Sequence, residues 1–259
     1  MRRKKRWFFL LLVIIVVVGV VLARREPTIA PGSFLVVDIG GRYVEAQPSG
    51  LIGQLLGSQK QVLVDLLLEL RKAALDNRLQ GVIVKITPAD LDFAKVQELR
   101  DALRRLQTAG KRVIAWVSGE GTSGNMAYFL ASVADQVYFS ENTVLPMTGL
   151  SATYLFLGGV WEHLDVEMQV EQIREYKTFG DFLSRQTMSE AHRHMANSLL
   201  DSLHEQFLTG IGEARGLPIE QVQHLIDAPT LTPGDFQQGG LIDGVRYYDE
   251  LVEALSGDP

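Results

Sequence analysis

Near its amino terminus the chain carries an unbroken run of 17 apolar or small residues, from Trp7 to Ala23. As a helix this run would rise about 25 Å, which is at the short end of what spans a bilayer. Five basic residues precede the run, and Arg24 and Arg25 follow it. A buried core helix is a weak alternative, because such helices are rarely apolar on every face. The run therefore predicts one transmembrane helix ahead of the rest of the chain.

A cleaved signal peptide is the other interpretation, because it also joins a basic segment to an apolar one. Its apolar region is usually about 7–15 residues long, shorter than this run. The sequence VLARREP is also a poor cleavage site. We favour an uncleaved anchor over residues 1–25, single-pass in the inner or plasma membrane. By the positive-inside rule its amino terminus is cytoplasmic, and the main domain lies on the extracytoplasmic (periplasmic) side.

Charge is distributed unevenly along the chain. The net charge is −6, yet residues 1–25 hold seven basic residues and no acidic one, which leaves 18 basic and 31 acidic residues in the remainder. So acidic a body repels phosphate backbones, and we expect no nucleic-acid partner. By the same reasoning, anionic lipid attracts only the amino-terminal tip. The chain has no cysteine, which excludes disulfides, thiolate metal sites and cysteine nucleophiles.

Short apolar, β-branched runs alternate with amphipathic segments in the first half of the body. The runs predict strands and the segments predict helices. The predicted strands cover 34–39, 80–86, 112–117 and 136–139, and the predicted helices cover 61–77, 92–109 and 125–134. Strands that alternate with helices form a parallel sheet with right-handed crossovers. The sequence therefore predicts an α/β fold.

The second half of the body is mainly helical in pattern. A further strand is predicted at 168–173, before a long helix that runs to Arg215 with Ser189 as its N-cap. Shorter helices are predicted at 222–226 and 249–255, and a glycine-bearing loop at 232–244. Since composition does not shift again, residues 34–259 are predicted to be one domain. Residues 26–33, with two prolines, are predicted to be a linker.

The sequence offers little for metal or triad chemistry. No HExxH pattern is present, and His192 and His194 are two residues apart on a predicted helix, so they face different ways. We expect no metal and no cofactor. A Ser–His–Asp triad stays open because its members meet only in space, although no G-x-S-x-G turn is present. The glycine-rich loop 119–124 joins a strand to a helix, and it either binds an anion or is a plain tight turn.

Lys177, in REYKTFGDF, is the candidate catalytic residue. Taken alone it is an ordinary exposed lysine. A catalytic role requires a neutral amine, and burial against apolar neighbours lowers the pKa of a lysine. A neutral lysine next to a serine hydroxyl takes its proton during attack on a carbonyl.

Three segments resemble the signal peptide peptidase A (protease IV) family: AGK before an apolar strand, YFLASVADQVYFS, and EYKTFGDFLSRQTMSEA. The resemblance covers about residues 34–250. It implies a fold related to ClpP and the crotonases, with β-β-α units stacked in a spiral and a C-terminal helical arm. It also implies a Ser–Lys dyad between neighbouring domains or protomers, with Lys177 at the position of the family lysine.

The chain departs from this family at the nucleophile. Domains that carry the serine have Ser–Gly–Gly–Tyr, and aligning that tyrosine with Tyr128 puts Asn125 at the serine position. Ser123 lies two residues earlier and serves only after a loop shift. The glycine pair of the oxyanion hole is replaced by the sequence Thr87–Pro88–Ala89–Asp90. The chain is thus similar to the lysine-donating half of a tandem enzyme.

Three functions follow as hypotheses. The first is a membrane-anchored serine endopeptidase component that degrades signal peptides or other membrane-associated peptides, with Lys177 as general base. Its expected partners are peptide substrates, the membrane, and either further copies of the chain or a serine-bearing domain. The second is a non-catalytic scaffold or assembly subunit with a peptidase-like fold. The third, a crotonase-like acyl-CoA enzyme, conflicts with an extracytoplasmic location.

Overall fold

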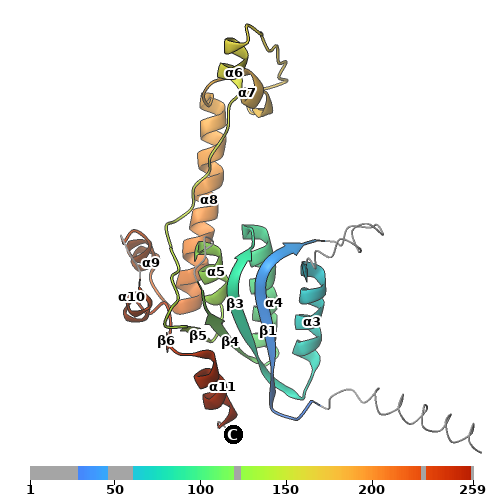
Figure 1. The fold of residues 1–259 in the computed structure, drawn as a ribbon, viewed down its shortest axis with the longest axis vertical. Coiled ribbons are helices and arrows are strands. Elements are labelled where there is room, and N and C mark those ends of the chain that lie inside the picture. Colours follow the sequence, from blue (N-terminus) through green and yellow to red (C-terminus); the bar gives the residue numbers. More distant parts are fainter. Residues whose placement is uncertain (1–28, 46–60, 120–123, 229–231, 258–259) are drawn as a thin grey trace, which may run out of the picture.

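The computed structural model describes residues 29–45, 61–119, 124–228 and 232–257 (Figure 1). The predicted anchor at 1–25 lies outside these ranges. Within them, no helix combines the length and the apolar character needed to cross a bilayer.

A parallel sheet of six strands forms the centre of the body, in the order β2-β1-β3-β4-β5-β6. The strands are β1 (Ser33–Val44), β2 (Gln61–Val62), β3 (Leu79–Asp90), β4 (Arg112–Val117), β5 (Gln136–Phe139) and β6 (Gly244–Val245). Every neighbouring pair is parallel. The α/β class and the parallel sheet are therefore confirmed.

Nine helices are described. They are α3 (Leu63–Leu75), α4 (Phe93–Thr108), α5 (Gly124–Ala131), α6 (Gly158–His163), α7 (Phe179–Ser184), α8 (Glu190–Arg215), α9 (Ile219–Ile226), α10 (Pro233–Gln238) and α11 (Tyr248–Ser256). The first three alternate with strands as predicted, while α6 to α10 all lie between β5 and β6. The predicted helices at 61–77, 92–109 and 125–134 correspond to α3, α4 and α5.

Both faces of the sheet are covered, which explains why β4 and the middle of β3 are largely apolar. Successive side chains point to opposite faces, so Val82, Val84 and Ile86 join the main core. Ile83 lies on the other face, in a smaller cluster with Leu251 of α11. In the main core, Tyr128 donates its hydroxyl to the Leu241 carbonyl oxygen at 2.7 Å. Burial raises the pKa of Tyr128, so its phenol stays a neutral donor.

A buried arginine joins three helices beneath the arm. Nη1 of Arg100, on α4, donates to the carbonyl oxygen of Phe129 on α5, and Nη2 donates to the Gly210 carbonyl oxygen on α8 at 2.7 Å. The Ser132 hydroxyl accepts a further bond from Nη1 at 2.7 Å. A Cβ at Gly210 would lie 2.7 Å from the Phe129 ring, so only glycine permits this approach. Burial lowers the pKa of Arg100 to about 10, which leaves the guanidinium charged at neutral pH.

The arm is the long helix α8, which leaves the body and carries α6 and α7 at its far end (Figure 1). Its 26 residues rise about 39 Å. Ser189 caps its start by accepting from the His192 amide, as the sequence predicts, and Gly216 ends it in the left-handed conformation. A C-terminal helical arm is thus present, and the end that carries α6 and α7 is remote from the sheet.

Two sequence predictions about local structure are wrong. Residues 168–173 form no strand, because they lie in the exposed segment between α6 and α7, with no neighbouring strand to pair with. The predicted loop 232–244 contains α10, started by a capping box between Thr232 and Asp235, and ends in β6. The capping box supplies the helix start that the apolar pattern of this short segment does not reveal.

We predict that Arg100→Met destabilises the protein by about 3 kcal/mol or more, because it leaves buried carbonyl acceptors without a donor. The matched control is Arg104→Met on the same helix, which removes only an exposed ion pair with Asp101. That variant should lose less than about 1 kcal/mol. Urea unfolding monitored by circular dichroism measures both, and equal losses would contradict the role assigned to Arg100.

Candidate active site

Lys177 lies at the tip of the arm, two residues before α7, and its side chain is exposed. Its backbone amide donates to the Arg174 carbonyl oxygen at 3.0 Å, which closes a turn. The next residue, Thr178, is buried. The lysine backbone is therefore held in place while its amine is free to meet another surface.

Asp181 anchors the segment that carries Lys177. It is 4% exposed, and it accepts hydrogen bonds from the Ser189 hydroxyl and, at 3.3 Å, from Nε2 of Gln172. Ser189 is also the N-cap of α8, so one hydroxyl serves both the cap and the carboxylate. This contact joins α7 to the start of the arm helix.

His192 completes the same buried cluster. Its Nδ1 lies 3.8 Å from Oδ2 of Asp181 and has no hydrogen-bond partner among the described residues. Its ring packs edge-on against Tyr154, with centroids 4.8 Å apart, and also contacts Phe156. His192 thus packs the arm helix against the segment that contains Tyr154 and Phe156 and leads into α6.

Two opposing effects act on the pKa of Asp181. Burial raises this pKa, but the hydrogen bonds from Ser189 and Gln172, with the nearby Arg185 charge, outweigh burial and lower it below 3.8. The carboxylate is therefore charged at neutral pH. Its charge favours the folded arm tip above about pH 4, and that contribution is lost as the pH falls.

Backbone contacts hold α6 and α7 together. Leu157 donates to the Phe182 carbonyl oxygen at 2.8 Å, and Gly158 donates to the Arg185 carbonyl oxygen at 2.9 Å. A Cβ on Gly158 would lie 2.5 Å from that second oxygen, so the approach requires glycine. The arm tip is a small packed unit rather than a loose loop.

The surface around Lys177 is unusually apolar for an exposed segment. Ile173 is 90% exposed, Phe179 is 79% exposed and Tyr176 is 52% exposed. Leu164 and Val166 are exposed on the neighbouring turn after α6. Contiguous apolar side chains at a surface mark contact with another molecule or domain. Such a contact is what would dehydrate the lysine.

Asn125, at the position expected for the nucleophile, has a structural role. Its side-chain amide donates to the Gly149 carbonyl oxygen, and its Oδ1 accepts from the Thr148 amide at 3.1 Å. Both polar ends of the side chain are therefore used to hold the segment after β5. Ser123 and most of the glycine-rich loop lie outside the described residues.

Strand residues occupy the expected oxyanion position. Thr87 to Asp90 continue β3, with Ala89 paired to Gly41 of β1. The cavity beside Thr87 and Pro88 has a volume of about 10 Å³, space for one water molecule at most. A Cβ on Gly119 would meet Pro88 at 3.2 Å, which shows how closely the neighbouring turn approaches.

The structure does not bring Lys177 to this position in one chain. The α5 helix packs at the foot of the arm, where Phe129 contacts Phe207 with ring centroids 5.3 Å apart. His192, in the cluster that holds α7, lies 15 residues earlier on α8, a rise of about 22 Å. Lysine and nucleophile position are thus held at opposite ends of a rigid helix, and a dyad requires a second domain or protomer.

His192 and His194 lie in different surroundings, as their spacing on the helix predicts. His192 is buried, whereas His194 is exposed and its Nδ1 lies 3.2 Å from the Tyr176 hydroxyl. No cluster of three or more metal-ligating side chains is present in the described part of the chain.

Sequence reasoning missed Asp181, the residue that positions the lysine segment. The sequence does contain a signal for this contact. Asp181 is an acid in the first turn of a short helix, and Ser189, the N-cap of the next helix, follows eight residues later. The pattern is too common to identify a contact without the fold.

We predict that Asp181→Asn loosens the arm tip at neutral pH, because the Ser189 hydroxyl loses a charged acceptor. Amide hydrogen exchange in α7 and the first turn of α8 should be faster than in the unmodified chain. The two should converge only as the pH falls through the lowered pKa of Asp181, where the carboxyl becomes protonated.

The matched control is Asp201→Asn, an exposed acid on α8 for which no hydrogen bond or ion pair is seen in the described ranges. It should leave exchange at the tip unchanged at every pH. A difference between Asp181→Asn and the unmodified chain that persisted in acid would contradict the electrostatic explanation.

Comparison with known proteins agrees with the resemblance in the sequence. A profile described as Peptidase family S49 matches residues 105–258. The chloroplastic serine protease SPPA of Arabidopsis thaliana is 32% identical over 184 residues, which is 71% of this chain and 27% of that protein. Protease 4 of Haemophilus influenzae is 24% identical over 184 residues, covering 71% of this chain and 29% of that one. The chain thus spans less than a third of either relative.

A solved structure shows a weaker likeness. The ClpP protease catalytic domain from Plasmodium falciparum aligns with 82% of this chain and 85% of its own, at 11% identity and a TM-score of 0.38. A likeness at this level does not assign the spiral arrangement.

Proposed function

Because the chain belongs to peptidase family S49 and is a serine protease relative of the SppA type, we propose that it is the lysine-donating component of a Ser–Lys peptidase. The proposed substrates are signal peptides or other membrane-associated peptides. The ClpP- and crotonase-like spiral, the anchor at 1–25 and an extracytoplasmic main domain are parts of the same proposal.

One observation carries this proposal: Lys177 stands on a rigid tip, surrounded by exposed apolar side chains. A lysine in open water is protonated and accepts no proton. Docking of a second domain onto Ile173, Tyr176 and Phe179 would remove water from around the amine and lower its pKa. The geometry thus supports a base that becomes active only in the assembly.

The serine is proposed to come from that second domain or protomer. In the first step its Oγ attacks the peptide carbonyl carbon while the hydroxyl proton passes to the neutral Nζ of Lys177. The tetrahedral intermediate then collapses, the C–N bond breaks, and the protonated amine returns the proton to the departing amino group. Water repeats the sequence on the ester, with Lys177 again as base, and releases the acid product.

The assembly has two candidate forms, a homo-oligomer or a complex with a serine-bearing domain. The separation of Lys177 from α5 favours any form in which the arm of one unit reaches another unit. Both polar ends of Asn125 are used in structural hydrogen bonds, which favours a partner that carries its own serine.

A scaffold function is the alternative, and the closed cavity at Thr87 and Pro88 favours it. In that case the arm tip is an assembly surface and Lys177 is a surface lysine. The two functions differ in whether the amine is needed for turnover once the assembly has formed.

We predict that Lys177→Ala lowers peptidase turnover by about a thousandfold or more in the assembly with a serine-bearing SppA domain, because the general base is lost. Arg174→Ala, an exposed cation three residues away, is the matched control and should retain activity. Size-exclusion chromatography checks that both variants still assemble. Full activity of the assembled Lys177→Ala variant would establish the scaffold function instead.

We also predict that a fluorophosphonate probe does not label this chain alone, and that Ser123→Ala leaves turnover of the assembly unchanged. Both outcomes follow if the nucleophile belongs to the partner. Labelling of the isolated chain that disappears in Ser123→Ala would assign the serine to this chain. It would refute the proposal that the partner supplies the nucleophile.

A further inference from the structure

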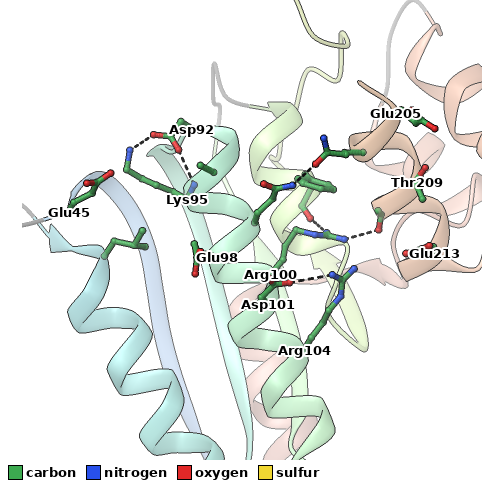
Figure 2. Close-up of a pocket in the computed structure, with 16 residues that line it drawn as sticks. Glu45, Asp92, Lys95, Glu98, Arg100, Asp101, Arg104, Glu205, Thr209 and Glu213 are labelled. Atoms are coloured by element: carbon green, nitrogen blue, oxygen red, sulfur yellow. Dashed lines mark hydrogen bonds and ion pairs between the residues drawn. The ribbon is translucent and has the colours of Figure 1, made fainter. Parts of the chain in front are cut away.

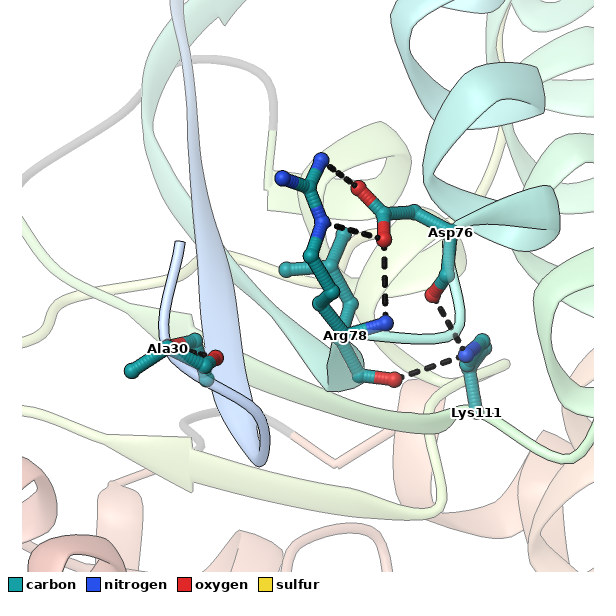
Figure 3. Close-up of polar contacts among 6 residues, drawn as sticks. Ala30, Asp76, Arg78 and Lys111 are labelled. Atoms are coloured by element: carbon teal, nitrogen blue, oxygen red, sulfur yellow. Dashed lines mark hydrogen bonds and ion pairs between the residues drawn. The ribbon is translucent and has the colours of Figure 1, made fainter. Parts of the chain in front are cut away.

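The first described residues are fixed against the turn that follows α3 (Figure 3). Gly32 donates its amide to the Arg78 carbonyl oxygen at 2.9 Å. Both the amide and the hydroxyl of Ser33 donate to the Ala30 carbonyl oxygen. The chain therefore enters the domain beside the carboxyl end of α3, and this entry point is held by hydrogen bonds.

This entry point limits how far α3 can lie from the apolar run. Only five residues separate Ala23, the end of the run, from Ile29, where the described residues begin. The six steps from Ala23 to Ile29 reach no more than about 20 Å, even when fully extended. If the run spans a membrane, the entry point lies close to the bilayer, and the carboxyl end of α3 lies beside that entry point.

The outer side of α3 is apolar although it is exposed. Val64 is 50% exposed, Leu68 is 46% exposed and Leu75 is 77% exposed. Their spacing of four and seven places them along one side of the helix. A groove of about 540 Å³ lies beside them, between α3 and α4. The core side of α3 is already filled by Leu63 and Leu70, so this second apolar side has no partner in the described part of the chain.

Basic side chains accompany the apolar stripe. Arg71 and Arg105 line the same groove, both are exposed, and neither forms an ion pair with any described residue. Nearby Arg78 is paired with Asp76 at 2.6 Å, and Lys111 donates to two backbone oxygens. The two unpaired arginines therefore leave this corner positive on a body that is acidic overall.

The opposite end of α4 has the reverse charge (Figure 2). A groove of about 940 Å³ between α4 and α8 contains four glutamates for which no hydrogen bond or ion pair is seen in the described ranges: Glu45, Glu98, Glu205 and Glu213. Asp92 and Asp101 in the same groove are paired with Lys95 and Arg104. An anionic surface would therefore repel this end and attract the corner with Arg71 and Arg105.

We propose that the α3 stripe, defined as Val64, Leu68, Arg71, Leu75 and Arg105, rests on the anionic headgroups of the membrane that holds the chain. The inference depends on the membrane attachment in the proposed function, but not on peptidase activity. Leu75 enters the interface as the most exposed apolar side chain of α3, and the two arginines contact lipid phosphates. The contact removes the freedom of the body to turn on its short linker, so that the arm meets its partner in a fixed orientation.

Because the chain has no native cysteine, the test can use single-cysteine labels without background. Leu75→Cys carries a fluorophore in the full chain, reconstituted in phosphatidylcholine vesicles with and without phosphatidylglycerol. The matched control is Leu164→Cys, which replaces an apolar residue 61% exposed at the arm tip. Acrylamide quenching of the label at 75 should be several-fold weaker than at 164, and weaker still when phosphatidylglycerol is present.

Charge reversal then tests the headgroup contact itself. Each basic residue near an anionic surface contributes about fivefold to binding, so Arg71→Glu with Arg105→Glu should weaken the contact by about 25-fold or more. Quenching at 75 should rise in that double variant only in vesicles that contain phosphatidylglycerol. Circular dichroism checks that the variant is folded.

Flotation of the vesicles reports attachment of the chain separately from contact at α3. Quenching at 75 that equals quenching at 164 overturns the proposal, whether or not the chain floats. Protection at 75 that is equal in detergent and in both lipids also overturns it, since that pattern indicates a protein–protein interface. Failure of the peptidase assay leaves these readouts unaffected and refutes only the catalytic role.

Discussion

A buried guanidinium joins the arm to the body where Phe207 and Ile211 of α8 enter the main core. Arg100 donates to carbonyl oxygens on α5 and α8 from its place on α4, so three helices share one charged side chain. These acceptors are neutral dipoles, and the nearby charges of Asp101 and Glu213 also favour the charged guanidinium. This junction helps to set the direction of α8. The position of the arm tip, and with it the segment that contains Lys177, depends on that direction.

The arm separates two functions that a complete Ser–Lys site must combine. Its far end presents a lysine on a packed tip held by Asp181, Ser189 and His192. In the body, only a small cavity lies beside Thr87 and Pro88, which continue a strand, and both polar ends of Asn125 are used in structural hydrogen bonds. Under the proposed function, a chain built in this way acts only within an assembly.

Three exposed surfaces of the molecule differ in charge and polarity. The tip is apolar around Lys177, the groove between α4 and α8 is acidic, and the corner at the carboxyl end of α3 is apolar and basic. Each suits a different neighbour: another domain, water, and an anionic membrane. Charge counted along the sequence indicates only an acidic body. Folding gathers Arg71 and Arg105 at one groove, because helices α3 and α4 pack side by side.

Much of the fold follows from local pattern. The strands at 112–117 and 136–139 agree with the structure residue for residue, and Ser189 is the expected cap, because buried strands and N-caps depend on neighbouring residues. The predicted strand at 168–173 is absent because β-branched residues there meet no neighbouring strand. The short helix α10 begins at a capping box, which the spacing of apolar residues alone does not reveal.

For the site, sequence by itself determined that Lys177 is the candidate base and that a serine is missing where the family places one, since residue identity and order are sufficient for both statements. Only the tertiary structure decided that Asp181 and Ser189 hold the lysine segment, and that α8 keeps Lys177 far from α5. The reason is physical: hydrogen bonds between helices and the rise of a rigid helix are distances in space, and no spacing along the chain contains them.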